Sequence, residues 1–149
     1  MTKQEFVKQA HAAATQSSKA SGMPAMVTVA QAALESNWGL SKLSLEANNY
    51  FGIKAHRTQE QIEMKTGECE HGATVVVQAE FAKYPSMLDC FQSRDRILLH
   101  GACYASARRV LGDEAGFITE IAKHWATDPK YAEKLREVLQ EVKGLVQAK

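Results

Sequence analysis

A short apolar helix that ends at a glycine constrains this chain most. It reads Ala30-Gln-Ala-Ala-Leu-Glu-Ser-Asn-Trp-Gly39, with the carboxyl group of Glu35 one turn before the stop. The many alanines require close approach by neighbouring elements, so this helix belongs inside a compact body. The sequence neighbours of Glu35 are apolar: Ala32, Ala33, Leu34 and Trp38. Desolvation of its charged form should raise its pKa, and such an acid can protonate a leaving oxygen. Taken alone, the stretch also fits the commoner case of a solvated helix glutamate.

Periodicity and capping residues divide the rest of the chain into helices and one hairpin. The patterns predict helices over about 2–21, 24–36, 41–47, 86–100, 104–110, 113–124 and 128–146. A β-branched, alternating segment predicts a β-hairpin of about 62–70 and 74–82, with its turn at Glu70-His-Gly72. With no repeat and no linker, we predict a single α+β domain over 1–149, a mostly helical body with one small hairpin.

Composition excludes several classes of function. The net charge of +1 gives no field for nucleic acid or for an anionic membrane surface. The first residues lack the apolar run of a signal peptide, and no stretch reaches transmembrane length. We therefore expect synthesis in the cytoplasm without a leader and no stable membrane association.

Cysteine and arginine usage predicts structural rather than ligand-binding roles. Cys69, Cys90 and Cys103 are odd in number and match no zinc spacing, so we expect small buried hydrophobes or free thiols and no metal site. Four arginines could line an anion-binding face, although a solvated helix surface is the favoured interpretation: Arg94, Arg96, Arg108 and Arg109.

The chemistry that remains is a pair of carboxylates. Glu35 lies at a helix end, and Glu68 and Glu70 lie two apart on the predicted hairpin, on one face of a strand. Cleavage of a glycosidic bond uses one carboxylic acid to protonate the leaving oxygen and a second carboxylate to stabilise the oxocarbenium ion or activate water. An exposed strand decorated with charge is the alternative interpretation of the hairpin glutamates. Aromatic side chains that could stack on sugars, some of which must be core, are Trp38, Tyr50, Phe51, Tyr84, Trp125 and Tyr131.

Five motifs in order carry a family resemblance. They are Ala30–Gly39, Asn49-Tyr-Phe-Gly-Ile-Lys54, Glu68-x-Glu70-x-Gly72, Phe81-x-x-Tyr84-x-Ser86 and Ala126-Thr-Asp-Pro129-x-Tyr131-Ala. Together they resemble glycoside hydrolase family 73, the N-acetylglucosaminidases of bacterial and phage wall hydrolases, over about residues 5–142.

The resemblance implies a lysozyme-like fold with the hairpin lobe flanking the cleft. It implies an endo-β-N-acetylglucosaminidase that cleaves the β-1,4 bond between N-acetylglucosamine and N-acetylmuramic acid in peptidoglycan. Glu35 matches the general acid and Glu68 the second carboxylate, with Glu70 as the alternative; either water or the substrate's own acetamido group attacks. Substrate-binding positions carried over are Trp38, Asn49, Phe51, Glu70, Tyr84, Trp125 and Tyr131.

The same resemblance sets expectations for partners and location. We expect glycan strands of peptidoglycan as the partner, no cofactor, and a monomer that acts on the cell wall after holin-type or dedicated export. A phage endolysin, a secreted effector and a domain excised from a longer protein all fit.

Two departures from the family pattern keep other functions open. Trp125 and Cys69 stand where family members usually carry tyrosine. Tryptophan can stack on a sugar but supplies no phenolic oxygen, whereas Cys69 should point away from Glu68 on a strand and affect packing only. A lytic transglycosylase, which needs a single glutamate, and a wall-binding module without turnover are the two alternatives.

Overall fold

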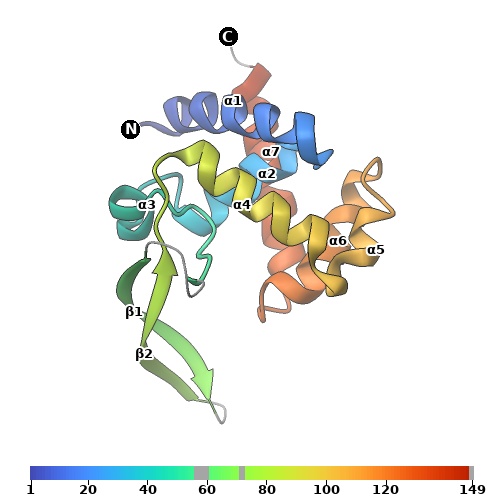
Figure 1. Ribbon diagram of the computed structural model, residues 1–149. Helices are drawn as coiled ribbons and strands as arrows, with labels where there is room; N and C mark the ends of the chain where they lie inside the picture. Colours follow the sequence, from blue (N-terminus) through green and yellow to red (C-terminus); the bar gives the residue numbers. More distant parts are fainter. Residues whose placement is uncertain (56–60, 71–72, 148–149) are drawn as a thin grey trace.

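The molecule is a helical body from which one β-hairpin projects (Figure 1). The computed structural model describes residues 1–55, 61–70 and 73–147; within the hairpin, residues 61, 63–70 and 73–78 are described by their backbone alone. The elements in chain order are α1 (Lys3–Ser21), α2 (Ala25–Ser36), α3 (Lys42–Ala47), β1 (Gln61–Glu70), β2 (Ala73–Ala82), α4 (Met87–His100), the 3-10 turn η1 (Ala102–Tyr104), α5 (Ala105–Arg108), α6 (Glu114–Trp125) and α7 (Tyr131–Gln147). The predicted α+β class is confirmed.

Side-chain caps begin four of the helices where the sequence predicts a start. The oxygens of Thr2, Ser41, Ser86 and Asp113 each accept a hydrogen bond from the backbone N–H three residues further on, at 3.1–3.2 Å. Each bond satisfies a donor that the first helical turn leaves unpaired. These helices therefore begin within a residue of the predicted positions.

Two predicted helices differ from the structure. The last one begins at Tyr131 rather than at Pro129, because Asp128 first closes a turn by accepting from the backbone N–H of Lys130 at 2.9 Å. The predicted helix 104–110 is only the short α5, preceded by a 3-10 turn in which the N–H of Tyr104 bonds to the carbonyl of Gly101.

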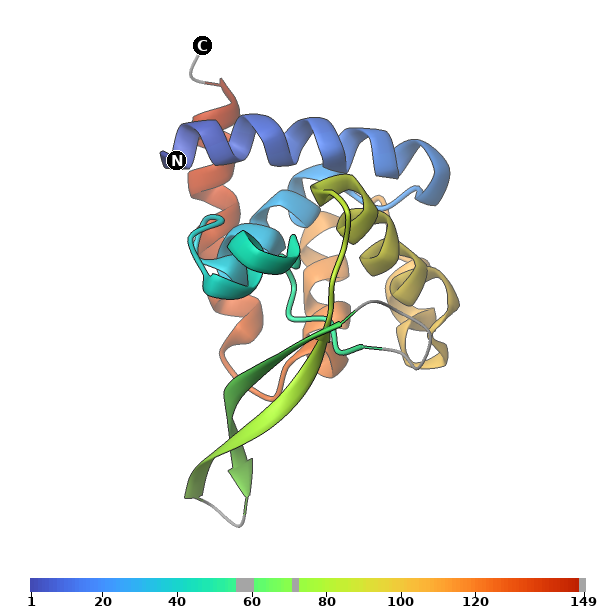
Figure 2. The ribbon, with the colours of Figure 1, turned by 60° about the vertical axis from the view of Figure 1, so that its left-hand side comes forward.

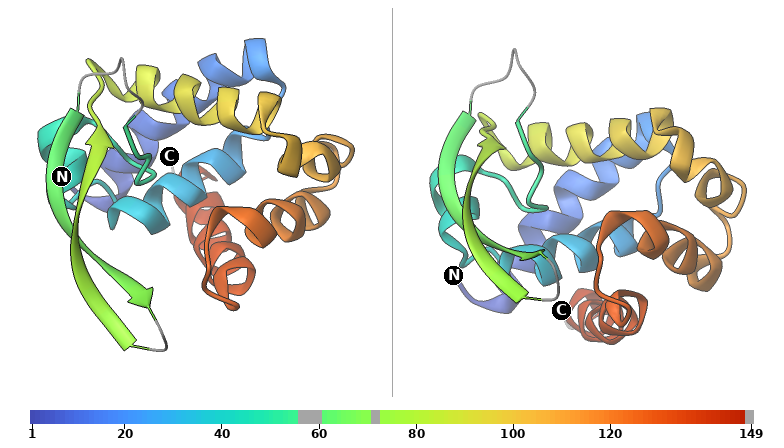
Figure 3. Two further views of the ribbon diagram at one scale, coloured as in Figure 1. Left: turned by 60° about the horizontal axis from the view of Figure 1, so that its bottom comes forward. Right: turned by 90° about the horizontal axis from the view of Figure 1, so that it is seen from below.

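Helix α2 forms the centre of the core. It packs against both α1 and α7, and α1 also packs against α4. Figure 3 shows α2 running between α4 and α7 in both of its views. Its buried residues include three alanines, Ala30, Ala32 and Ala33, which are fully enclosed. Because alanine has the smallest side chain with a Cβ, the neighbouring helices can approach α2 closely.

The hairpin is antiparallel and projects from the helical body (Figure 2). Its register pairs Gln61 with Ala82 at the base and Glu70 with Ala73 at the tip. Strand β2 also bonds to the segment before β1, where Ala82 donates to the carbonyl of Ile53 and Ala55 donates to the carbonyl of Glu80, both at 2.9 Å. The predicted hairpin is confirmed; its turn at 71–72 lies outside the described residues.

The side chain of Asn49 ties the base of the hairpin to the body. Its amide nitrogen donates to the carbonyls of Ile53 and Ala82, each at 2.9 Å, and its oxygen accepts from the N–H groups of Phe51 and Ile53. The residue is 1% exposed. A buried amide with all these partners fixes the local backbone, because each group would otherwise lose a hydrogen bond.

A tight left-handed turn ends α2. Asn37, Trp38 and Gly39 have φ angles of 50°, 57° and 79°. Only glycine adopts this region without strain, and at Gly39 there is also no space: an added Cβ would lie 2.8 Å from a ring carbon of Phe6. The turn and the packing of α1 on it therefore depend on each other.

We predict that Gly39→Ala lowers the free energy of unfolding by about 1–3 kcal/mol, because the substitution combines a strained φ with a steric clash. Urea denaturation measures the change. The matched control is Gly144→Ala in α7, where no described heavy atom lies within 4 Å of an added Cβ. That control should gain up to about 1 kcal/mol, since it removes a glycine from a helix. Equal effects of the two variants would contradict the prediction.

Candidate active site

Glu35 lies on the last turn of α2, and the C-terminal end of this helix faces the side of the molecule where the hairpin stands (Figure 3). The helix ends because Asn37 adopts the left-handed conformation and its N–H bonds back to the carbonyl of Ala33. The alanines before Glu35 point into the core, so the helix is held rigidly up to the residue that carries the acid.

The side chain of Glu35 is exposed to solvent, which differs from the burial expected from its apolar neighbours. Ala32 and Ala33 are buried in the core, and Leu34 is half-buried. The predicted direction of the pKa change is nevertheless confirmed, because desolvation by the surrounding protein raises the pKa of Glu35. Both findings fit a carboxyl group that is open on one side and has packed protein on the other. A general acid needs both properties, since its proton must be retained and must also reach a substrate.

Tyr131 is the partner of this acid. Its hydroxyl hydrogen-bonds to the carboxyl group of Glu35, which favours the charged form and partly offsets the rise in pKa. Burial, followed by the negative charge of Glu35, raises the pKa of the Tyr131 hydroxyl itself. Tyr131 therefore keeps its proton at any ordinary pH and serves as a hydrogen-bond donor.

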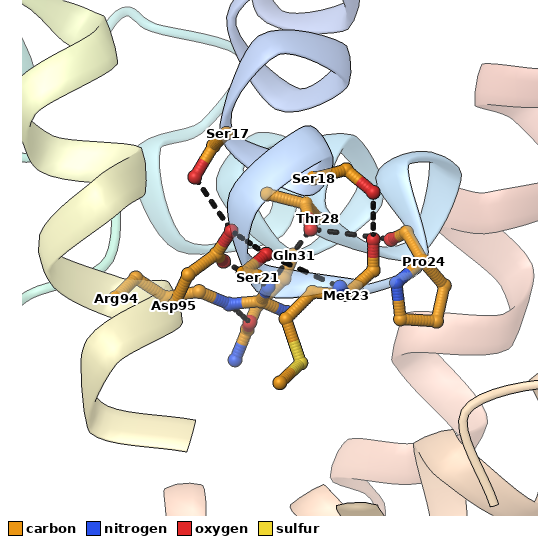
Figure 4. Close-up of polar contacts among 9 residues, drawn as sticks. All are labelled: Ser17, Ser18, Ser21, Met23, Pro24, Thr28, Gln31, Arg94 and Asp95. Carbon is orange, nitrogen blue, oxygen red and sulfur yellow. Dashed lines mark hydrogen bonds and ion pairs between the residues drawn. The ribbon is translucent and has the colours of Figure 1, made fainter. Parts of the chain in front are cut away.

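A buried arginine stands behind this pair, which the sequence did not predict. Arg94 is 0% exposed, so both its predicted solvated position and a place on an anion-binding face are wrong. Its Nε donates to Oε1 of Gln31 at 2.9 Å, and its Nη1 donates to Thr28 at 2.8 Å and to Asp95 at 2.9 Å. Figure 4 shows Arg94 of α4 reaching across to Thr28 and Gln31 of α2, whereas Asp95 beside it faces Ser17 and Ser21 of α1. Gln31 in turn donates from Nε2 to the Tyr131 hydroxyl at 3.1 Å.

The other arginines of that group lie elsewhere. Arg96 and Arg109 are exposed. Arg108 donates to the carbonyls of Leu98 and Gly101 at 2.7 and 2.8 Å, so it satisfies backbone groups at the end of α4. They do not form one face with Arg94.

Most of the aromatic candidates have packing positions in the structure. Phe51 is 2% exposed and its ring lies 5.2 Å from that of Phe91. Tyr84 is buried, and its hydroxyl shares a hydrogen bond of 2.8 Å with Ser93. Trp125 is half-buried and contacts Phe51 at 6.3 Å between ring centroids.

Trp38 and Asn49 are likewise engaged within the protein. The half-buried ring of Trp38 packs edge-on against Phe6, and the Lys3 ammonium lies 4.6 Å from its centroid. Asn49 is enclosed and fully bonded at the base of the hairpin, as described above. Their contacts, like those of Phe51 and Tyr84, hold the surroundings of the site in place.

The second carboxylate has a defined backbone position. Glu68 pairs with Val75 and Glu70 with Ala73 near the tip of the hairpin. Their side chains, and that of Cys69, lie outside the described residues, so the choice between Glu68 and Glu70 stays a prediction.

The structure describes the side chains of two cysteines. Cys90 is a buried free thiol, and desolvation raises its pKa to about 12; Cys103 is a free thiol and is exposed. In the part of the chain that the structure describes, no three His, Cys, Asp or Glu side chains gather as a metal site would need. None of the described helices has the length and apolar character to cross a membrane.

A central helix that ends at a solvent-accessible acid, with a hairpin standing beside that end, is the arrangement of lysozyme-like glycoside hydrolases. Residues 11–144 match the glucosaminidase family model, described as mannosyl-glycoprotein endo-beta-N-acetylglucosaminidase, and the chain belongs to this family. The lysozyme-like fold expected from the sequence is thereby confirmed.

The chain is similar in sequence and in structure to several wall hydrolases. The chain is 32% identical over 120 residues to the exo-glucosaminidase LytG of Bacillus subtilis, covering 77% of this chain and 43% of LytG. It is 32% identical over 147 residues to the peptidoglycan hydrolase FlgJ of Salmonella typhimurium, covering 95% and 46%. The chain thus spans about half the length of these curated relatives. A crystal structure of a peptidoglycan hydrolase mutant from Sphingomonas sp. A1 superposes with a TM-score of 0.85 and 32% identity, covering 98% of this chain and 99% of that one.

We predict that Glu35→Gln stabilises the protein at neutral pH. The folded state raises the pKa of Glu35 above its ordinary value of 4.5, so ionisation of this residue costs stability as the pH rises above that value. The amide has no charge to desolvate and still accepts a bond from Tyr131. The melting temperature of the variant should therefore exceed that of wild type at pH 7, and the gap should shrink towards pH 4.

The control for this stability prediction is Glu46→Gln, on an exposed glutamate of α3. Melting curves of both variants and of wild type across the same pH series separate the effect of the site from the general effect of removing one carboxylate. The prediction is wrong if the two substitutions change the melting temperature alike at every pH.

Proposed function

We propose that this chain hydrolyses the β-1,4 bond between N-acetylglucosamine and N-acetylmuramic acid in peptidoglycan, with Glu35 as the general acid. The observation that carries the proposal is the state of Glu35: its carboxyl group is accessible, and desolvation raises its pKa. Membership of the glucosaminidase family supplies the class of bond. The names of LytG and FlgJ, an exo-glucosaminidase and a peptidoglycan hydrolase, support the substrate.

The reaction assigns each carboxyl group a task. Glu35 donates its proton to the glycosidic oxygen as the bond from this oxygen to the anomeric carbon breaks. The carboxylate left on Glu35 then accepts the hydrogen bond from Tyr131, which stabilises it until a solvent proton restores the acid. Glu68 on the hairpin is the second carboxylate, with Glu70 as the alternative. It stabilises the positive charge on the sugar. Water attacks the anomeric carbon and releases its proton to solvent, either directly or after the substrate's acetamido oxygen has first attacked that carbon.

The partner is a glycan strand of peptidoglycan, and the place of action is the cell wall. Exo-glucosaminidase LytG and the autolysin of Enterococcus faecalis are named among the relatives, which supports a wall substrate. The protein acts as a monomer on one strand at a time. No cofactor takes part in this chemistry, because both proton transfer and charge stabilisation are assigned to side chains.

We predict that Glu35→Gln lowers the rate of release of reducing ends from purified cell wall by about two to four orders of magnitude, because the amide cannot donate the proton. The melting temperature serves as the folding control. Full activity in a folded Glu35→Gln variant would disprove the proposed acid.

Mass spectrometry of the products tests the reaction type. Hydrolysis adds one water for each bond cleaved, whereas a lytic transglycosylase leaves an anhydro-sugar end without that water. We expect the hydrated product with N-acetylglucosamine at the new reducing end. Binding to wall without any cleavage over a long incubation would instead identify a wall-binding module.

We predict that Glu68→Gln and Glu70→Gln affect turnover unequally. Loss of the second carboxylate should lower kcat by at least about a hundredfold, and we expect this at Glu68. The neighbouring substitution two residues away is its matched control, because it removes the same charge from the same strand. A larger loss at Glu70 would move the role to that residue, and activity like that of wild type in both variants would contradict a two-carboxylate mechanism.

A further inference from the structure

A directed chain of hydrogen bonds runs from Arg94 to Tyr131, the residue that acts on Glu35. The Nε of Arg94 donates to Oε1 of Gln31 at 2.9 Å, and Nε2 of Gln31 donates to the Tyr131 hydroxyl at 3.1 Å. This hydroxyl lies close enough to the Glu35 carboxyl group to lower its pKa by hydrogen bonding. Arg94 and Gln31 are 0% exposed and Tyr131 is 5% exposed. The links come from three helices, α4, α2 and α7, whose packing therefore fixes the chain. Figure 4 shows its first part, from Arg94 to Gln31.

The direction of every bond follows from the chemistry of Arg94. A guanidinium group has only donors, so the atom of Gln31 that faces it must be the amide oxygen. The amide nitrogen then faces Tyr131 and donates to it. Because this bond occupies an acceptor position of the Tyr131 hydroxyl, the hydroxyl proton is free to point at Glu35. Tyr131 is thus a donor to Glu35 and not an acceptor from it.

We propose that Arg94 and Gln31 are positioning residues that determine which carboxyl oxygen of Glu35 carries the catalytic proton. This inference rests on the proposed role of Glu35 as the general acid. The oxygen that accepts from Tyr131 is not the one that bears hydrogen, so the proton lies on the other oxygen and is available to the leaving group. Without the directed chain, protonated Glu35 could donate its proton to Tyr131 instead.

No proton is transferred along the hydrogen-bond chain during the reaction. Glu35 gives its proton to the glycosidic oxygen as the bond to the anomeric carbon breaks, and the resulting carboxylate is reprotonated from solvent. Gln31 and Tyr131 keep their hydrogens and only orient the acid.

The burial of Arg94 supports a role in orientation rather than in stability. Its ion pair with Asp95 is enclosed, with side-chain exposures of 0% and 3%, and buried ion pairs of this kind contribute little to stability. Among the described residues, Nη2 of Arg94 has no hydrogen-bond partner, which adds a cost. The guanidinium carbon lies 5.6 Å from the centre of the Phe51 ring, which helps to hold its plane.

Few charged groups act on the acid in the described part of the chain. Among the described side chains, the Tyr131 hydroxyl of α7 is the one that lowers the pKa of Glu35, by hydrogen bonding. Arg94 of α4 acts on Tyr131 through its charge, and Glu35 does the same from α2. From the hairpin, the glutamates Glu68 and Glu70 could add a negative charge, so every comparison below keeps both of them.

The decisive variant is Gln31→Glu. It keeps the shape of the side chain and the bond to Arg94, but it replaces the amide donor by an acceptor, so the Tyr131 hydroxyl turns towards residue 31. We expect kcat on peptidoglycan to fall about ten- to a hundredfold with little change in KM. The alkaline limb of the pH–rate profile should move to higher pH, because the Glu35 carboxylate loses a hydrogen bond.

Gln31→Met separates direction from charge. It removes the donor without adding a negative group, and we expect a smaller fall of kcat, about two- to tenfold, with KM again unchanged. The matched control is Thr28→Val, which removes another partner of Arg94 from the same helix and leaves the bonds of Gln31 in place. It should lower the melting temperature while keeping kcat and the alkaline limb of wild type.

Melting curves show which variants fold. If Gln31→Glu does not fold, Tyr131→Phe takes its place, because it keeps the ring and removes the hydroxyl. A carbon-13 NMR titration of the Glu35 carboxyl group in Tyr131→Phe should then show a pKa above that of wild type. The proposal is overturned if the folded variants of Gln31 or Tyr131 keep the kcat and alkaline limb of wild type, or if Thr28→Val changes them equally. Glu35→Gln, assayed in parallel, distinguishes failure of the proposed acid from failure of the positioning role. Full activity of Glu35→Gln refutes Glu35 as the general acid. If Glu35→Gln is inactive but the Gln31 variants are unaffected, only the role of the hydrogen-bond chain is refuted.

Discussion

The close packing of α2 is the constraint on which the site depends. This helix is enclosed along nearly its whole length by α1 and α7, and small side chains such as Ala30 and Ala33 allow that contact. Within this helix, Glu35 on the last turn is the one exposed residue. The acid is therefore presented at the surface by an element that cannot shift without disturbing the core. Its carboxyl group consequently has protein behind it and solvent in front, which reconciles its exposure with its raised pKa.

The interior of this protein is not purely apolar, and the polar part is arranged around the same helix. Asp95 accepts from Ser17 and Ser21 of α1 at 2.6 and 2.8 Å and from Arg94 beside it. Arg94 then reaches α2 and, through Gln31, α7. Buried polar groups of this kind lose much when one partner is removed, so they specify a single relative placement of four helices. The same network that fixes the core thus ends at the acid.

The local parts of this structure were predictable from sequence, and the long-range parts were not. Caps such as Thr2 and Ser86 act on backbone groups three residues away, so a short window of sequence contains the whole interaction. The family motifs likewise single out Glu35, the residue proposed as the general acid. In contrast, Arg94 meets Gln31 across 63 residues, and Gln31 meets Tyr131 across 100. An arginine next to an aspartate on a helix is usually solvated, so nothing local revealed that this one is buried.

The hydrogen bonds of Asn49 give the hairpin a mechanical connection, through Phe51, to the end of α6. The side chain of Asn49 donates to the carbonyl of Ala82 on β2 and accepts from the N–H of Phe51, two residues after Asn49 in the sequence. The ring of Phe51 rests against Trp125 at the end of α6. A two-stranded ribbon has little rigidity of its own, so its tilt is set at this anchor. A change in the tilt of the ribbon would accordingly be transmitted through Phe51 to the indole of Trp125.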